Sequence, residues 1–227
     1  MRCGPGCRQT DMYWQEDTDE TGFVVPDNVI DLAFSITCQA LPVDHAQALY
    51  TAVAGVLSWL ADEAGAGIHT IHGADSGNGW ERPEDVLLLS RRTKLVLRLP
   101  KARVEAARAL TGQCIDVAGH AMEIGEAQPR QLSKSGTLYA RYVSIEAPGD
   151  EEVFLHTCVA ELREQGIRAK KFLCGKTTTL HTDAGPLETR SLMVADLSLE
   201  DSVRLQEHGV GAHRHLGCGL FIASKAV

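Results

Sequence analysis

A histidine stands where the sequence predicts a helix to begin. In the stretch LPVDHAQALY, His45 directly follows Asp44, and apolar residues then recur at spacings of three and four up to Leu60. This period predicts a helix over 45–63, with Asp44 as its N-cap and His45 in the first turn. The positive end of the helix dipole lowers the pKa of a histidine placed there. His45 is therefore a candidate general acid or base, whereas the alternative is a solvated first-turn side chain.

The C-terminal stretch GVGAHRHLGCGLFIASK combines closely spaced glycines with basic side chains. Glycine permits positive φ and close backbone approach, so turned backbone amides in such a loop can bind an anion. A guanidinium in the same loop suits phosphate. The candidate anion-binding residues are Gly209, Gly211, His213, Arg214, His215, Gly217 and Gly219. The alternative is a helix-to-strand turn that binds nothing.

Charge is distributed unevenly along this chain, whose net charge is −8. Residues 1–90 carry 3 Lys and Arg against 14 Asp and Glu, whereas residues 91–141 carry 10 against 4. Such an asymmetry can build a phosphate-binding face on an acidic protein. The candidate phosphate-binding cations are Arg91, Arg92, Lys94 and Arg98 in this segment, and Lys170 and Lys171 beside a later hairpin. Strand alternation places half of each set on one face, and a solvated strand face is the alternative for the first set.

The composition is that of a globular, cytoplasmic protein. Hydrophobic residues make up 44% and aromatic residues 5% of 227 residues, so we expect aliphatic cores in two domains of about 100 residues each. No apolar run reaches the roughly 20 residues that cross a bilayer, and we expect no membrane partner. Seven scattered cysteines suit a reducing compartment. A pair such as Cys3 and Cys7 is weak evidence for a metal, and we expect neither a metal nor a cofactor.

The order of predicted elements repeats along the chain. Residues 1–26 form an acidic arm. Residues 27–130 then read strand, helix, strand, strand, helix and strand, and residues 131–227 repeat this order. The order is that of the split βαβ, ferredoxin-like fold. The sequence therefore predicts an α+β protein of two tandem ferredoxin-like (RRM-like) units with a Gly-rich loop near the C-terminus.

Local signals place several of these elements. Pro100 is predicted to open a helix through about Leu110, and a hairpin is predicted to turn at Ala118-Gly119. In the second unit, Asp150 caps one helix and a capping box at Ser198 begins another. The stretches AKKFLCG and TTTLHT are predicted as separate strands.

Combined, these features resemble the CRISPR repeat-processing endoribonucleases, the sixth Cas family of the RAMP superfamily. The stretches LPVDHAQALYTAV, GIHTIHG, TLYARYVSIEA, SVRLQEHGVG and RHLGCGLFIASK are similar to its MYXAN-type branch, and LGCGLF is the most specific. The resemblance runs from about residue 29 to the end and leaves the acidic arm uncovered. Ala46-Gln47 stand where that branch usually has Gly-Tyr, and the final ASK replaces a Pro-containing end.

The resemblance implies a metal-independent cut within the repeat of precursor CRISPR RNA, which frees guide RNAs. A 2′-OH attacks the neighbouring phosphorus while a base takes its proton and an acid protonates the leaving 5′-oxygen, giving a 2′,3′-cyclic phosphate and a 5′-OH. His45 then serves as general acid or base, with the phosphate between it and the loop 209–219. The implied partners are a repeat RNA read by hairpin shape, since aromatic residues are few, and other Cas subunits of a surveillance complex.

Three other functions are alternatives to this one. A non-cleaving RNA-binding subunit would keep the fold, and a regulatory protein for small ligands would suit the negative net charge. A metal-dependent hydrolase lacks a motif such as H-E-x-x-H. No pattern singles out His120, His156, His181 or His208.

Overall fold

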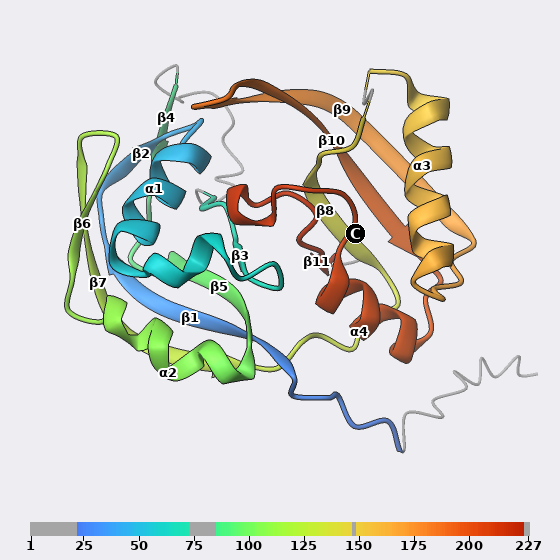
Figure 1. Ribbon diagram of the computed structural model, residues 1–227, viewed down its shortest axis with the longest axis horizontal. Coiled ribbons are helices and arrows are strands. Elements are labelled where there is room, and N and C mark those ends of the chain that lie inside the picture. The colour runs from blue at the N-terminus through green and yellow to red at the C-terminus, as the bar shows by residue number, and fades with distance from the viewer. Residues whose placement is uncertain (1–21, 73–84, 147–148, 225–227) are drawn as a thin grey trace, which may run out of the picture.

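The computed structural model describes residues 22–72, 85–146 and 149–224. Within these ranges the strands form three antiparallel sheets, and the two larger sheets come from successive parts of the chain (Figure 1). We call the parts of the chain that carry these two sheets the N-terminal unit (residues 29–130) and the C-terminal unit (residues 138–223). Most of the predicted acidic arm, with Cys3 and Cys7, lies outside the described residues. In the described part of the chain, no helix is both long and apolar enough to cross a bilayer.

The N-terminal unit is a five-stranded sheet with helices packed on one face. Its strands, in the order β3-β5-β1-β7-β6, are β1 (Val29–Thr37), β3 (Gly67–Ile68), β5 (Lys94–Pro100), β6 (Cys114–Val117) and β7 (His120–Arg130). Its helical segments are α1 (Ala46–Val56), α2 (Val104–Ala107) and the 3₁₀ turns η1 (Ser58–Ala61), η2 (Lys101–Arg103) and η3 (Arg108–Leu110). Leu32 and Leu97 are fully buried on the helix-covered face, as period-two alternation predicts, and Leu49 and Val53 of α1 join the same core. A separate two-stranded sheet pairs β2 (Ala40–Pro42) with β4 (Val86–Leu88).

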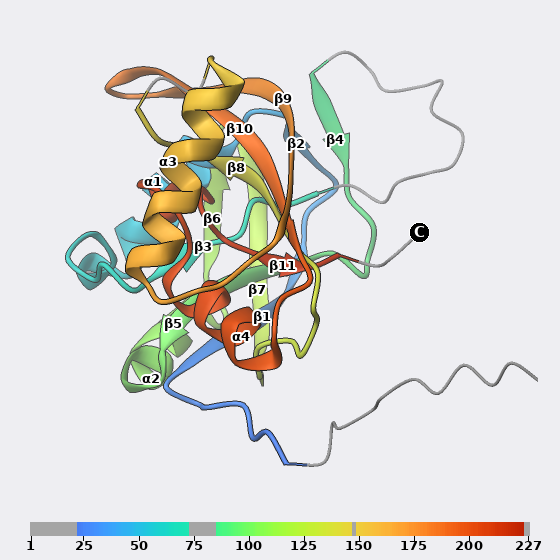
Figure 2. The ribbon, with the colours of Figure 1, turned by 90° about the vertical axis from the view of Figure 1, so that its right-hand side faces the viewer.

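The C-terminal unit is a four-stranded sheet in the order β11-β8-β10-β9. Its elements are β8 (Leu138–Val143), α3 (Glu151–Glu164), β9 (Lys171–Thr182), β10 (Gly185–Ala195), α4 (Leu199–His208), the 3₁₀ turn η4 (Arg214–Leu216) and β11 (Ile222–Ala223). Figure 2 shows α3 crossing one face of this sheet, where Phe154 and Leu162 are buried. Asp150 caps α3 and Ser198 caps α4, as the sequence predicts.

Both units have the same strand connectivity. In each, the first and third main strands lie in the middle of the sheet, the second strand flanks the third, and the fourth flanks the first. This is the antiparallel βαββαβ order of the ferredoxin-like fold. The predicted α+β class with two tandem ferredoxin-like units is confirmed.

Three predicted elements differ in detail. The helix expected over 45–63 leaves the α conformation at Leu57, whose φ of −105° and ψ of 75° are not helical, and η1 follows. The helix expected from Pro100 is a helical run broken into η2, α2 and η3. Residues 171–175 of AKKFLCG and the stretch TTTLHT belong to one strand, β9, because a register shift opposite Arg190 and Leu192 lets Gly175 and Lys176 continue the strand.

Candidate active site

The boundary between the two units lies at α1. The β9–β10 hairpin extends across to the start of this helix, and the segment after α4 returns between the units (Figure 1). Ala46 of α1 is buried in one apolar cluster with Leu180, Leu216 and Cys218 of the C-terminal unit. Residues from both units therefore meet around the first turn of α1, where the sequence places its candidate general acid or base.

His45 is buried at this boundary, with 2% of its surface exposed. It stands at the N-cap of α1 without capping it. Its Nε2 accepts a hydrogen bond from the Ile71 amide at 3.0 Å, so Nδ1 carries the proton and donates to the Pro42 carbonyl at 2.9 Å. Burial lowers the pKa of His45, which opposes the effect of the carbonyl hydrogen bonds.

Both ring nitrogens of His45 are thus engaged by the backbone. The expectation of a first-turn histidine presented to a phosphate is wrong for this geometry, and the pKa falls through burial rather than through the helix dipole alone. Proton transfer to RNA by His45 would require one of these hydrogen bonds to open. The catalytic role of His45 stays a prediction.

The buried, neutral His45 predicts a pH-dependent stability. Its folded pKa lies below the ordinary value of about 6.5, so its contribution is complete above pH 6.5 and is lost as the pH falls from there towards the folded pKa. We expect the difference in unfolding free energy between wild type and His45→Asn to be smaller at pH 5.5 than at pH 7.5. Urea unfolding at the two pH values measures this difference. A difference that does not change with pH would contradict a neutral His45.

Asp44 contacts the C-terminal unit instead of capping α1. Its Oδ2 accepts hydrogen bonds from the backbone N–H of His181 at 2.8 Å and from His181 Nδ1 at 2.7 Å. Nearby, Gln47 Nε2 donates to Asp183 Oδ2 at 2.9 Å. The predicted N-cap role of Asp44 is therefore wrong, because the tip of the β9–β10 hairpin competes for its carboxylate.

His215 of the Gly-rich loop lies against α1, and His213 lies beside His215. The ring centroids of Tyr50 and His215 are 4.5 Å apart, and those of His213 and His215 are 5.8 Å apart. His213 is exposed and His215 is partly buried. Burial, and then the neighbouring His213, lowers the pKa of His215. The prediction that this loop faces the first helix across the unit boundary is confirmed.

The glycine amides of this loop are bonded within the protein. The Gly209 amide donates to the Leu205 carbonyl, and the Gly211 amide donates to the Glu161 carboxylate. The Gly217 amide donates to the Arg214 carbonyl, and the Gly219 amide donates to the Tyr142 carbonyl. A carboxylate of α3 therefore already occupies the amide of Gly211. The expectation that these four amides form a free anion-binding nest is wrong.

Two predicted RNA-binding arginines are structural. Arg98 is 1% exposed, and its guanidinium donates to both carboxylate oxygens of Asp31 and to the Gln206 and Phe221 carbonyls of the C-terminal unit. Arg214 donates to the Glu207 and His208 carbonyls at the end of α4. Burial lowers the pKa of Arg214 to about 10. A direct RNA contact by Arg98 is contradicted by its burial, and the Arg214 guanidinium caps a helix.

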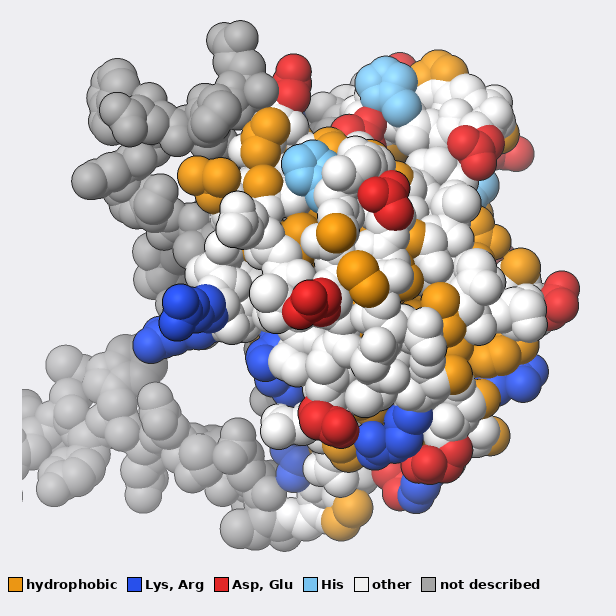
Figure 3. All heavy atoms as spheres, turned by 90° about the vertical axis from the view of Figure 1, so that its left-hand side faces the viewer, with side chains coloured by type: hydrophobic (Ala, Val, Ile, Leu, Met, Phe, Trp, Pro, Cys, Tyr) orange, Lys and Arg blue, Asp and Glu red, His pale blue; other side chains and the backbone are white. Residues whose placement is uncertain are grey.

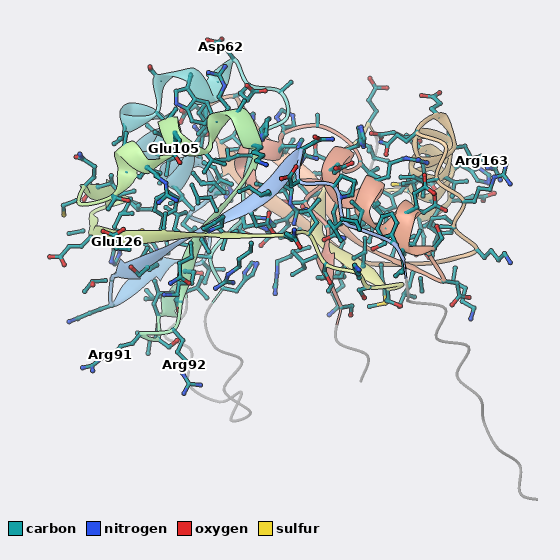
Figure 4. The ribbon with its side chains drawn as sticks, turned by 90° about the horizontal axis from the view of Figure 1, so that it is seen from below. Asp62, Arg91, Arg92, Glu105, Glu126 and Arg163 are labelled. Atoms are coloured by element: carbon teal, nitrogen blue, oxygen red, sulfur yellow. The ribbon has the colours of Figure 1, made fainter. Side chains whose placement is uncertain are left out.

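The remaining predicted cations lie on separate surfaces. Arg91 and Arg92 are exposed and project from the turn between β4 and β5 (Figure 4), and Lys94 is partly buried. Lys170 and Lys171 are exposed at the start of β9, where Lys171 pairs with Asp196. On the face drawn in Figure 3, Lys and Arg side chains are scattered among Asp and Glu side chains. That face therefore presents no single basic patch.

The sequence did not predict a hollow of about 350 Å³ between the two sheets. Asp31, His69 and Arg130 line it from the N-terminal unit, and Tyr139 and Arg141 line it from the C-terminal unit. Both arginines belong to the basic segment 91–141. The excess of Lys and Arg in this segment was the signal in the sequence that pointed to them. It could not show that two sheets from distant parts of the chain meet around these arginines.

Solved structures share this arrangement of two units. One, described as "CRISPR associated protein Cas6", aligns with a TM-score of 0.61 at 11% identity and covers 87% of this chain and 100% of that one. Another, "An RAMP protein binding different RNA substrates", aligns with a TM-score of 0.60 at 13% identity, covering 86% and 100%. A third, "Characterization of a Cas6-related gene from Pyrococcus furiosus", has a TM-score of 0.58 at 12% identity, covering 85% and 97%. These likenesses define the fold class, a tandem pair of ferredoxin-like units.

The sequence itself gives the family. The family model "Cas6 Crispr" matches residues 30–226. The chain therefore belongs to the Cas6 family of CRISPR proteins, and the resemblance noted in the sequence is confirmed. A relative from Myxococcus xanthus (strain DK1622), named "CRISPR-associated endonuclease Cas6", is 28% identical over 193 residues, covering 85% of this chain and 80% of that protein.

Proposed function

We propose that this protein is an endoribonuclease that cuts precursor CRISPR RNA within its repeat and so produces guide RNAs. The cut is a transesterification. A 2′-oxygen bonds to the adjacent phosphorus, the bond to the 5′-oxygen breaks, and the products carry a 2′,3′-cyclic phosphate and a 5′-OH. Because the attacking group belongs to the RNA, the step needs proton transfer and charge stabilisation but no metal-bound water.

The observation that carries this proposal is the match of the Cas6 family model over nearly the whole chain. The name of the Myxococcus relative adds endonuclease activity. The boundary between the units offers side chains that can transfer protons. Four histidines lie there around α1: His45, His181, His213 and His215. Histidine is the side chain that changes charge near neutral pH and exchanges protons most readily there.

The RNA-binding surface is proposed at the exposed predicted residues Arg91, Arg92, Lys170, Lys171 and His213, together with the partly buried Lys94 and His215. The hollow between the sheets adds Arg130, Arg141 and Tyr139, which can bind phosphates and stack on a base. Arg98, Arg214 and the loop glycines hold this surface in shape. A repeat hairpin as substrate, other Cas subunits as partners and a cytoplasmic location complete the proposal.

The proposed cut is tested with a labelled RNA that carries one repeat of the protein's own CRISPR array. We expect wild type to cut this RNA in EDTA, and to leave intact a matched RNA with a single 2′-deoxy nucleotide at the cut. The 5′ product should end in a cyclic phosphate. Cleavage of the 2′-deoxy RNA would contradict 2′-OH attack.

We keep a second candidate function, because His45 is buried and both of its ring nitrogens are hydrogen-bonded to the backbone. If wild type binds the repeat RNA tightly but leaves it uncut, the protein is a non-cleaving RNA-binding subunit. His45→Ala in the same assay tests the predicted catalytic role of His45, provided that the variant still folds and binds.

A further inference from the structure

The Asp44–His181 contact determines which ring nitrogen of the exposed His181 carries the proton. An ionised carboxylate accepts hydrogen bonds and cannot donate them, so the proton of neutral His181 lies on Nδ1 and the lone pair lies on Nε2. The His181 side chain is 81% exposed, and that of Asp44 is 31% exposed. No described residue forms a hydrogen bond with Nε2. His181 therefore presents a proton acceptor to solvent at the boundary between the units.

The carboxylate does more than anchor the hairpin. The backbone N–H of His181 already donates to Asp44 Oδ2, and this bond alone would join the units. The second bond, from the ring, orients the imidazole and places a negative charge beside it. A carboxylate in this position holds the imidazole in one tautomer and one orientation. His45, the residue after Asp44, has no ring nitrogen free to take a proton, because both of its nitrogens are bonded to the backbone.

The strand that carries His181 offers contacts for a phosphate backbone. β9 is one of the two edge strands of its sheet. Exposed side chains follow it from Lys170 and Lys171 through Lys176 and Thr177 to His181. Lysine amines and threonine hydroxyls are common phosphate contacts in nucleic-acid complexes. At about 3.3 Å per residue, Lys171 and His181 lie roughly 33 Å apart along the strand, so a bound RNA can contact both at different nucleotides.

We propose that His181 is the general base of the cut and that Asp44 is its positioning residue; this rests on the proposed function above. His181 Nε2 takes the proton of the 2′-OH as the 2′-oxygen bonds to phosphorus. The P–O5′ bond breaks, and the 5′-oxygen keeps its electron pair and takes a proton from water. The imidazolium then returns its proton to the hydroxide left behind, so the enzyme ends unchanged.

The test compares His181→Asn with wild type on the labelled repeat RNA. The asparagine amide can replace Nδ1 as a donor to Asp44, which keeps the bridge between the units, while Nε2 is lost. We expect the single-turnover rate constant at saturating protein to fall about 100-fold or more, with RNA binding unchanged. His156→Asn on the exposed face of α3 is the matched control and should cut at the wild-type rate.

The outcomes separate the two proposals. If wild type cuts and His181→Asn cuts equally fast, the base assignment is overturned while the proposed function stands. If wild type itself leaves the RNA intact, both proposals fall. Asp44→Asn should lower the saturating rate constant at least about 10-fold without weakening RNA binding. A loss of binding alone would mean that Asp44 is a structural bridge and would overturn its positioning role.

Discussion

Arg98→Leu is expected to lower the free energy of unfolding by about 3–5 kcal/mol. The guanidinium donates to Asp31 at 2.7 and 2.9 Å, and to the Gln206 and Phe221 carbonyls at 3.1 and 2.7 Å. Burial acts to raise the pKa of Asp31, but His69 and Arg98 outweigh burial and hold that pKa below its usual range. The substitution would leave this carboxylate and two carbonyls without their donor. It would also remove hydrogen bonds that join the two units.

Urea unfolding at pH 7, followed by circular dichroism, measures the loss. Lys101→Leu is the control, because Lys101 and its partner Asp27 are both exposed and the pair is expected to add little. Arg98→Lys should recover part of the stability, since an ammonium keeps the charge but cannot reach all four acceptors. A loss below about 1 kcal/mol for Arg98→Leu would show that the units hold together without it.

The fold could be predicted because its signals are local. Alternating apolar residues such as Leu32 and Phe34, caps such as Asp150, and the Ala118-Gly119 turn each depend on a few neighbouring residues. The errors arose where tertiary contacts overrode such signals. Gly175 reads as a break, but pairing with β10 carries the strand through it as a register shift.

The site was harder to predict because its contacts join distant segments. His45 was singled out by its place before a helix, but its burial depends on the Ile71 amide, 26 residues away. Arg98 looked like one of several surface cations, but two of its acceptors, the Gln206 and Phe221 carbonyls, lie more than 100 residues further along the chain. His181 carried no sequence pattern, because its partner Asp44 belongs to the other unit. The sequence could predict which segments lie near the site. The role of each side chain depends on its contacts across the boundary between the units.

Gly219→Ala is the second substitution with a large expected effect. Gly219 has a φ of +66°, which costs a residue with a Cβ about 1–2 kcal/mol. A Cβ there would also lie 2.3 Å from the Val210 carbonyl oxygen, so backbone on one side must move. Overpacking of this kind adds about 1–3 kcal/mol. We expect Gly219→Ala to lower the unfolding free energy by about 2–5 kcal/mol.

Two other glycines separate the causes. Gly112 also has a positive φ, +81°, but a Cβ there meets nothing within 4 Å, so Gly112→Ala should show the backbone cost alone. Gly55 lies within α1 with open space around it, and Gly55→Ala should stabilise the protein by about 0.5–1 kcal/mol. If Gly219→Ala loses no more than Gly112→Ala, the loop tolerates the added methyl group. A larger loss means that the close approach of Gly219 to Val210 sets the shape of the loop that carries His213 and His215.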